Sequence, residues 1–205
     1  MSQMSAPGVK MVLPALLQGV EEDAWRAKSA AIEMLGDMAF CAPKQLSSCL
    51  PTVVPKLIET LGDSHTKVQE SAVSALKKIA SVIKNPEVVA LVPNVLSALQ
   101  DPMVKTTSCL KTILQTQFIH VIDAASLALL MPVIRRAIYD RGSENRKLSA
   151  QIMASLYSLA DQKDLMPYLE GILPGLKNCL LDPAPEVRMS AARAIAALVK
   201  GTGNQ

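Results

Sequence analysis

Aromatic residues are scarce in this sequence and make up 3% of its 205 residues. Half of the residues are nevertheless apolar, so the core has to be built from Ala, Leu, Val, Ile and Met. No segment alternates apolar and polar residues with a period of two, as a half-buried β-strand would. The composition therefore predicts an all-α protein whose core consists of packed helices.

The motifs of the common catalytic classes are also missing. The sequence has neither GxGxxG nor GxxxxGK followed by Ser or Thr, the glycine-rich loops that hold nucleotide phosphates. Its two histidines, His65 and His120, are not followed by glutamate, so no repeated His-Glu pair is present to bind iron. The longest apolar run, residues 124–134, contains Pro132 and is too short to cross a bilayer. These absences argue against an enzyme, a cofactor, a metal site and a membrane protein.

Charge and cysteine content point to no special class. A net charge of +3 is well below the concentrated excess of a dedicated nucleic-acid binder. The cysteines form no CxxC pair and fall within predicted helices: Cys41, Cys49, Cys109 and Cys179. We expect four reduced, mostly buried thiols, as is typical of a cytoplasmic protein.

What the sequence does contain is an internal repeat of about 40 residues. Five prolines recur at this spacing, each after a large apolar residue: Pro14, Pro55, Pro93, Pro132 and Pro174. An aspartate follows each proline about eight residues later: Asp23, Asp63, Asp101, Asp140 and Asp182. This period is typical of an α-solenoid, in which each helix pair buries its apolar face against the next pair. The predicted fold is therefore all-α, a solenoid of about five HEAT repeats, each an antiparallel helix pair.

The repeated prolines and aspartates have structural explanations. A proline inside the first helix of a pair removes one backbone hydrogen bond, so we expect these helices to be bent. Each aspartate is expected to accept hydrogen bonds from the free N–H groups that open the second helix. We expect one HEAT-repeat array over residues 10–200, a disordered tail at 1–9 and a second tail at 201–205.

Three regions depart from the regular pattern. Residues 103–118 are rich in Ser and Thr, so we expect a shorter or irregular second helix in the third pair. Trp25 and Phe40 are too isolated to form a stacking platform, which favours roles in the core or in helix packing. Neither end has the polar outer face of a capping unit, so we expect a fragment of a longer array or ends that dock on a partner.

One cluster of cations is a candidate binding site for a partner or the ribosome. These cations bracket the turn of the fourth pair: Arg135, Arg136, Arg141, Arg146 and Lys147. Only Asp140 and Glu144 oppose them, so the cluster could attract RNA phosphates or an acidic partner. The alternative is that Arg146 pairs with Asp140, as Arg188 would with Asp182, and that the other cations form a solvated face. Both interpretations are open at this point.

Several segments resemble the central HEAT region of the general control non-derepressible protein 1 family. They are Phe40–Leu46, Cys49–Pro51, Val54–Leu57, Asp63–His65, Ile83–Glu87, Asp123–Leu129, Leu173–Lys177 and Leu181–Arg188. That region is itself similar to the HEAT domain of fungal translation elongation factor 3. The resemblance extends from about Leu13 to Lys200, nearly the whole chain.

The resemblance implies a non-catalytic, cytoplasmic scaffold of translational control. In this family the region associates with ribosomes and with an ATP-binding-cassette partner. The whole protein helps to activate the amino-acid-starvation kinase that acts on translation initiation factor 2 alpha. A contact with ribosomal RNA would be consistent with these roles. The alternative function is a general HEAT adaptor, such as a nuclear transport receptor or a phosphatase scaffold.

We expect the purified chain to hydrolyse no ATP and to retain no stoichiometric metal, because both the phosphate-binding loops and the His-Glu pairs are missing. Elemental analysis and an ATPase assay measure these two properties. About one iron or zinc ion per chain would contradict the expectation and would make His65 and His120 the first residues to mutate.

Overall fold

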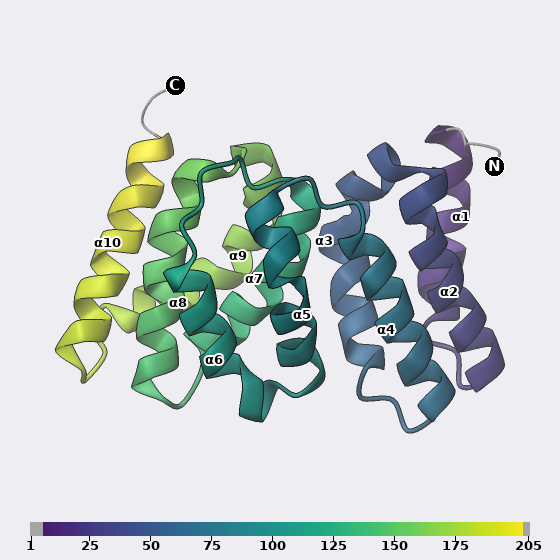
Figure 1. The fold of residues 1–205 in the computed structure, drawn as a ribbon, viewed down its shortest axis with the longest axis horizontal. Helices are drawn as coiled ribbons and strands as arrows, with labels where there is room; N and C mark the ends of the chain where they lie inside the picture. Colours follow the sequence, from purple (N-terminus) through teal and green to yellow (C-terminus); the bar gives the residue numbers. More distant parts are fainter. Residues whose placement is uncertain (1–5, 203–205) are drawn as a thin grey trace. The chain divides into compact units, whose positions relative to one another are not determined.

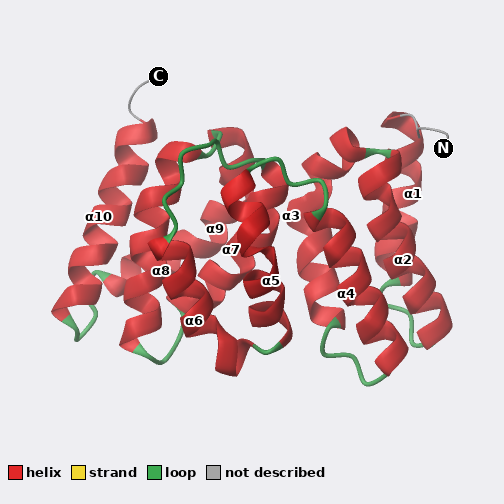
Figure 2. Cartoon of the chain, in the orientation of Figure 1, coloured by secondary structure: helices red, strands yellow, loops and turns green. Residues whose placement is uncertain are grey.

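A computed structural model describes residues 6–202 of the chain. These residues form ten α-helices and one short 3-10 turn (Figures 1 and 2). The helices are α1 Ala6–Gly19, α2 Trp25–Cys41, α3 Pro43–Thr60, α4 Thr66–Ala80, α5 Pro86–Gln100, α6 Pro102–Gln115, α7 Ala124–Ile138, α8 Ser143–Leu156, α9 Gln162–Cys179 and α10 Pro185–Thr202, with the turn η1 at Tyr157–Leu159. The described part contains no strand, and its single isolated bridge joins Ile122 to Ala160. The predicted all-α class is confirmed.

The helices belong to two compact units, residues 1–84 with α1–α4 and residues 85–205 with α5–α10. Within each unit, successive helices form pairs, and equivalent helices of neighbouring pairs stack. In the first unit α1 contacts α3 and α2 contacts α4. In the second unit one layer consists of α5, α7 and α9 and the other of α6, α8 and α10 (Figure 1). The five predicted helix pairs are confirmed, whereas a single array over residues 10–200 stays a prediction.

All five repeated prolines lie inside the first helix of a pair, as predicted: Pro14 in α1, Pro55 in α3, Pro93 in α5, Pro132 in α7 and Pro174 in α9. None of the five is buried. Each leaves the carbonyl four residues earlier without its N–H partner, and this carbonyl lies on the same helix face. At four of the five prolines the residue that carries this carbonyl is itself exposed or half-buried, so water can reach the carbonyl and the helix continues; the exception is Ala128, four residues before Pro132, which is 0% exposed.

Helix α6 does not show the predicted irregularity, although it is shorter than the second helices α2, α4 and α10, as the prediction also allowed. It is a continuous helix of 14 residues, the same length as α8. Two of its threonine hydroxyls donate to carbonyls four residues earlier, Thr106 Oγ1 to Pro102 O at 2.6 Å and Thr112 Oγ1 to Ser108 O at 2.9 Å. These bonds satisfy the polar side chains inside the helix. The irregular part is the connection after α6, residues 116–123.

The connection at 116–123 is fastened to the start of α5. Asn85, which is 2% exposed, caps α5 by accepting from Val88 N at 2.9 Å. Its side-chain amide donates to the carbonyls of His120 and Val121, both at 3.1 Å. Nδ1 of His120 lies 2.6 Å from a carboxylate oxygen of Glu87, and the hydrogen bond from His120 lowers the pKa of Glu87. One buried side chain thus both starts a helix and holds a loop.

The chain ends and some side chains differ from expectation. Helix α1 begins at Ala6, inside the predicted tail 1–9, and α10 continues to Thr202. The remaining tail residues, 1–5 and 203–205, lie outside the described part of the chain. Phe40 is 49% exposed, so a role in the core is wrong, and a role in helix packing stays a prediction. Trp25 does pack between helices, because its ring stacks on His65 with centroids 4.2 Å apart.

The cysteines are less uniformly buried than predicted. Cys109 and Cys179 are buried, whereas Cys41 and Cys49 are half-buried, and all four are free thiols. Burial raises the pKa of Cys109 to about 11, so this thiol stays protonated at neutral pH. Among the described helices, none has both the length and the apolarity needed to cross a membrane.

Substitution of Gly36 by Ala should destabilise the first unit. A Cβ at Gly36 would lie 2.8 Å from the Cα of Ala75, so α2 and α4 would have to separate. We expect a net loss of about 1–2 kcal/mol, since overpacking outweighs the better helix propensity of alanine. Gly62→Ala is the matched control, because its Cβ would lie 3.8 Å from the nearest atom. Urea unfolding that gave both variants equal stability would contradict this packing argument.

Candidate functional site

The predicted cationic cluster lies around the turn between α7 and α8. Arg135 and Arg136 are in the last turn of α7, and Arg141 is in the connecting turn. Arg146 and Lys147 follow near the start of α8. The structure therefore brings the five residues to one end of the fourth helix pair, but it gives them different environments.

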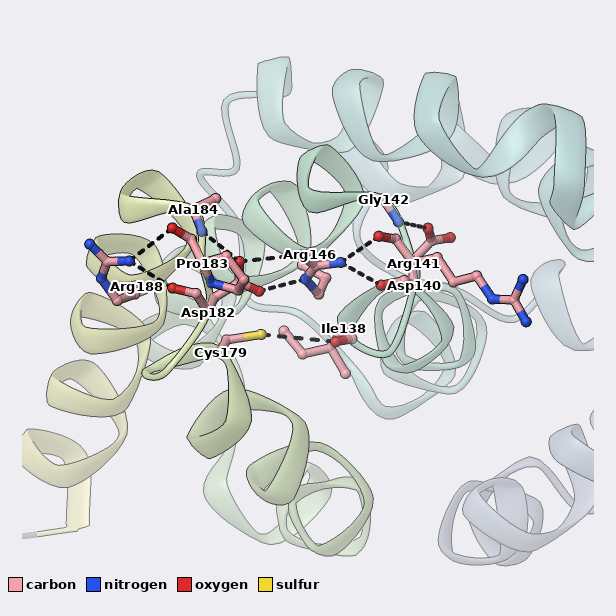
Figure 3. A network of polar contacts seen from close by, with 10 residues as sticks. All are labelled: Ile138, Asp140, Arg141, Gly142, Arg146, Cys179, Asp182, Pro183, Ala184 and Arg188. Atoms are coloured by element: carbon pink, nitrogen blue, oxygen red, sulfur yellow. Dashed lines mark hydrogen bonds and ion pairs between the residues drawn. The ribbon is translucent and has the colours of Figure 1, made fainter.

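Arg146 is fully engaged in structural contacts (Figure 3). Its Nε donates to Asp182 Oδ2 at 2.7 Å and its Nη2 donates to Asp182 Oδ1 at 3.2 Å. Its Nη1 donates to the carbonyls of Asp140 at 2.8 Å and Arg141 at 2.7 Å. The predicted ion pair between Arg146 and the Asp140 carboxylate is therefore wrong. Arg146 binds Asp140 only through its backbone carbonyl. Its carboxylate partner belongs to the next helix pair.

Asp182 links two helix pairs through its carboxylate. It is 7% exposed, and its Oδ1 also accepts from the N–H of Ala184 at 3.0 Å. The hydrogen bond from Arg146 is the main cause that lowers the pKa of Asp182, so the carboxylate stays ionised. One carboxylate thus fixes its own turn and binds the preceding pair.

Arg188 repeats one half of the contacts of Arg146. Its Nη1 donates to the carbonyls of Asp182 at 2.7 Å and Pro183 at 3.0 Å. These are the same two positions that Arg146 binds in the preceding turn. The expected ion pair between Arg188 and the Asp182 carboxylate is therefore wrong, because that carboxylate is taken by Arg146.

The first unit contains the same arrangement with different residues. Lys28 Nζ donates to Asp63 Oδ2 at 2.7 Å, and Asp63 Oδ1 accepts from the N–H of His65 at 2.8 Å. The side chain of Gln69 donates to the carbonyl of Asp63 at 2.6 Å. The hydrogen bond from Lys28 is the main cause that lowers the pKa of Asp63. Lys28 thus binds the aspartate of the next pair and Gln69 binds a carbonyl of its own turn, whereas Arg146 makes both kinds of contact.

These contacts correct the role predicted for the repeated aspartates. Asp63, Asp140 and Asp182 do not cap the first turn of the second helix. Each accepts from the N–H two residues later, the N–H of the residue that precedes the helix. Asp101 directly precedes α6, and its side chain makes no capping hydrogen bond. The aspartates therefore stabilise the turn itself. In Asp63 and Asp182 the second oxygen binds a cation of the preceding pair, whereas in Asp140 it accepts from Asn145 of the same pair.

The third and fourth pairs are joined by a neutral version of this link. Thr107 Oγ1 donates to Asn145 Oδ1 at 2.8 Å, and the amide of Asn145 donates to Asp140 Oδ2 at 3.2 Å. Lys111 also forms an ion pair with Glu144 at 2.9 Å, and both side chains are about half exposed. The third pair thus reaches Asp140 through the side-chain amide of Asn145, and not through a cation.

The other cations of the cluster remain on the surface. Arg135, Arg136 and Arg141 are exposed, and Lys147 is half-buried close to Glu144. Arg135 lies across α9, because a Cβ at Gly171 would come within 3.0 Å of its Nε. These three exposed arginines are the part of the predicted cluster that can meet a partner.

The structural role of Arg146 and Arg188 could have been predicted from their spacing in the sequence. Arg146 and Arg188 each stand six residues after a repeated aspartate, and Gln69 stands six residues after Asp63. A long polar side chain at that position reaches back over the turn to its carbonyls. Between residues 6 and 202 no three His, Cys, Asp or Glu side chains gather in a way that could hold a metal ion.

Comparisons with known proteins agree with this architecture. The family described as "EF3 N-terminal HEAT repeat" matches residues 1–76, and "Elongation factor 3/GNC1 HEAT repeat" matches residues 105–205. The chain is 58% identical over 203 residues, 99% of its length, to the human "Stalled ribosome sensor GCN1". This chain belongs to the elongation factor 3/GNC1 HEAT-repeat family. The predicted resemblance is confirmed.

Other GCN1 relatives match over the same range. The "eIF-2-alpha kinase activator GCN1" of Dictyostelium discoideum is 53% identical over 205 residues, and that of Saccharomyces cerevisiae is 39% identical over 205 residues. Elongation factor 3 of Mycosarcoma maydis is 28% identical over 95% of the chain. The chain spans 8% of the length of the GCN1 relatives and 19% of this elongation factor 3.

Arg146→Ala should destabilise the second unit by roughly 2 kcal/mol, because it leaves the Asp182 carboxylate buried without its cation. The pKa of Asp182 is lowered in the folded state, so this contribution is present above the ordinary carboxyl pKa and disappears as the pH falls through the folded-state pKa. Urea unfolding at pH 7 and in the acid range measures both effects.

Two variants serve as controls for this prediction. Arg146→Lys keeps the charge but loses the planar fork, so its stability should be intermediate. Arg141→Ala removes an exposed side chain and should change stability by less than about 0.5 kcal/mol. A stability difference between Arg146→Ala and the parent chain that did not shrink at low pH would contradict the ion-pair explanation.

Proposed function

We propose that this chain is a non-catalytic, cytoplasmic segment of a translation-control scaffold that associates with ribosomes. The single observation that carries the proposal is its 58% identity, over 99% of its length, to a protein named for sensing stalled ribosomes. A shared solenoid fold alone needs far less sequence identity than this.

We further propose that the segment contributes to activation of the kinase acting on translation initiation factor 2 alpha. Two relatives that match the whole chain carry the name of an activator of that kinase. Binding of an ATP-binding-cassette partner is proposed from the similarity to elongation factor 3. A role as a transport receptor or phosphatase scaffold has no such support.

The geometry supports binding rather than catalysis. The carboxylates whose pKa is lowered form ion pairs that hold helices together, for example Asp63 with Lys28 and Asp182 with Arg146. The buried thiol of Cys109 has a raised pKa and is a poor nucleophile. The exposed Arg135, Arg136 and Arg141 form the proposed contact with ribosomal RNA phosphates.

Reversal of these three arginines to glutamate should weaken co-sedimentation of the chain with purified eukaryotic ribosomes. Each phosphate contact that is lost should lower the slope of log affinity against log salt by about 0.7–0.9. Helicity and melting temperature should change little, because exposed charges contribute little to folding. Co-sedimentation over a salt series measures the affinity and the slope together.

The control for this experiment is an equal charge reversal elsewhere on the same unit. Lys163, Arg193 and Lys200 are exposed and lie outside the cluster, so their reversal to glutamate changes the net charge by the same amount. If both triple variants lose affinity equally, only net charge matters and the cluster is not the site. If the parent chain does not sediment with ribosomes at any salt concentration, the proposed association is wrong.

A further inference from the structure

We propose that a polar groove between α5 and α6 is a docking site for an acidic side chain of another protein, and that Lys105 binds the carboxylate of that side chain. The proposal rests on the side chains of the third helix pair and does not depend on the role in translation.

The groove has a volume of about 230 Å³ and lies along one side of the third pair. Two residues of α5 and four of α6 line it: Asn94, Ser97, Lys105, Ser108, Cys109 and Thr112. The four positions in α6 follow helical spacing and form one stripe. Thr107 and Lys111, which contact Asn145 and Glu144 of α8, lie on another side of the same helix. The groove is therefore on the side of α6 that is turned away from α8.

Three side chains of the groove have hydrogen-bond donors to spare. Within residues 6–202, the side chains of Asn94, Ser97 and Lys105 form no hydrogen bond or ion pair. Asn94 and Lys105 are exposed, and Ser97 is half-buried. Lys105 is the one charged residue among those that line the groove. A ligand that satisfies these groups has to bring hydrogen-bond acceptors and a negative charge.

The hydroxyl groups of α6 add acceptors to the same groove. Ser108 Oγ donates to Lys105 O at 3.0 Å, and Thr112 Oγ1 donates to Ser108 O at 2.9 Å. Each hydroxyl has thereby used its hydrogen but keeps lone pairs that can accept. A peptide segment suits this mixture, because its carboxylate accepts hydrogen bonds while its backbone N–H groups donate them. The Ser and Thr residues that set α6 apart in the sequence thus give the groove its polar lining.

The size and the charge of the groove argue against other ligands. Sites for cofactors and drug-sized molecules typically have volumes of about 300–1,000 Å³, so a nucleotide is too large for this groove. A phosphate monoester carries roughly two negative charges at pH 7, and phosphate sites usually combine an arginine fork with backbone N–H groups. A single lysine balances a single carboxylate. The groove therefore favours a glutamate or aspartate side chain.

An NMR titration of the isotope-labelled chain with a capped glutamate, N-acetyl-glutamate N-methylamide, tests the proposal. The backbone amide signals of the groove residues should shift and reach saturation. The equivalent capped glutamine has the same shape without the charge and should bind about tenfold more weakly, because hydrogen bonds to ionised groups are the stronger ones. Lys105→Ala should lower the affinity for the capped glutamate by roughly fivefold.

Two further variants separate a specific site from an effect of net charge. Lys163→Ala is the matched control, because Lys163 is exposed in the same unit but lies outside the groove, and it should leave the affinity unchanged. Asn94→Ala should weaken binding as well. If Asn94 and Lys105 hold the same carboxylate, the double variant should lose less affinity than the two single losses combined predict.

Four outcomes would overturn the proposal. The signals of the groove residues could stay unchanged at saturating capped glutamate, or capped glutamine could bind equally well. A capped phosphoserine could bind more tightly than the capped glutamate, which would make the groove a phosphate site. Finally, Lys105→Ala could lower the melting temperature of the free chain by more than about 4 °C, which would mean that a group of this chain already occupies the groove.

Discussion

The stacking of helix pairs depends on a buried carboxylate that must be satisfied from two sides. A carboxylate removed from water is costly unless hydrogen bonds and a cation replace its hydration. Asp182 obtains one bond from its own turn and a guanidinium from the preceding pair, and Asp63 obtains equivalent bonds from His65 and Lys28. At these two junctions the ion pair therefore favours one stacking register, because a shifted register would leave the carboxylate unpaired.

The need to pair the buried carboxylate also decides which of the surface arginines are available to a ligand. Arg146 looks like a member of a basic patch, but its donors are committed to Asp182 and to two carbonyls. If Arg146 bound RNA instead, the Asp182 carboxylate would stay buried without its cation, which would destabilise the fold. Arg135, Arg136 and Arg141 have no comparable obligation to a buried carboxylate, so a ligand can use them without weakening the stack.

The repeat itself was readable from the sequence, but the pairing across it was not. Prolines and aspartates at a constant spacing identified five helix pairs, because each marks a fixed position within a pair. The same period cannot say whether Arg146 meets the aspartate six residues before it or the one 36 residues after it, because stacked helix pairs bring both turns close to Arg146. Phe40 shows a second limit: an isolated aromatic residue at the end of α2 looked like core and is 49% exposed.

The third pair shows how the stack tolerates a weaker link. There the aspartate of the following turn, Asp140, receives an amide from Asn145 instead of a cation, so less electrostatic energy holds the two pairs together. A second attachment holds the connection at 116–123, because Asn85 donates to two of its carbonyls and Ile122 N donates to Leu159 O at 2.9 Å. This second attachment acts at the opposite end of the helices from the turns. At the turns, the third and fourth pairs are therefore joined by the Asn145 amide and the exposed Lys111–Glu144 ion pair, in place of a buried ion pair such as that of Arg146 and Asp182.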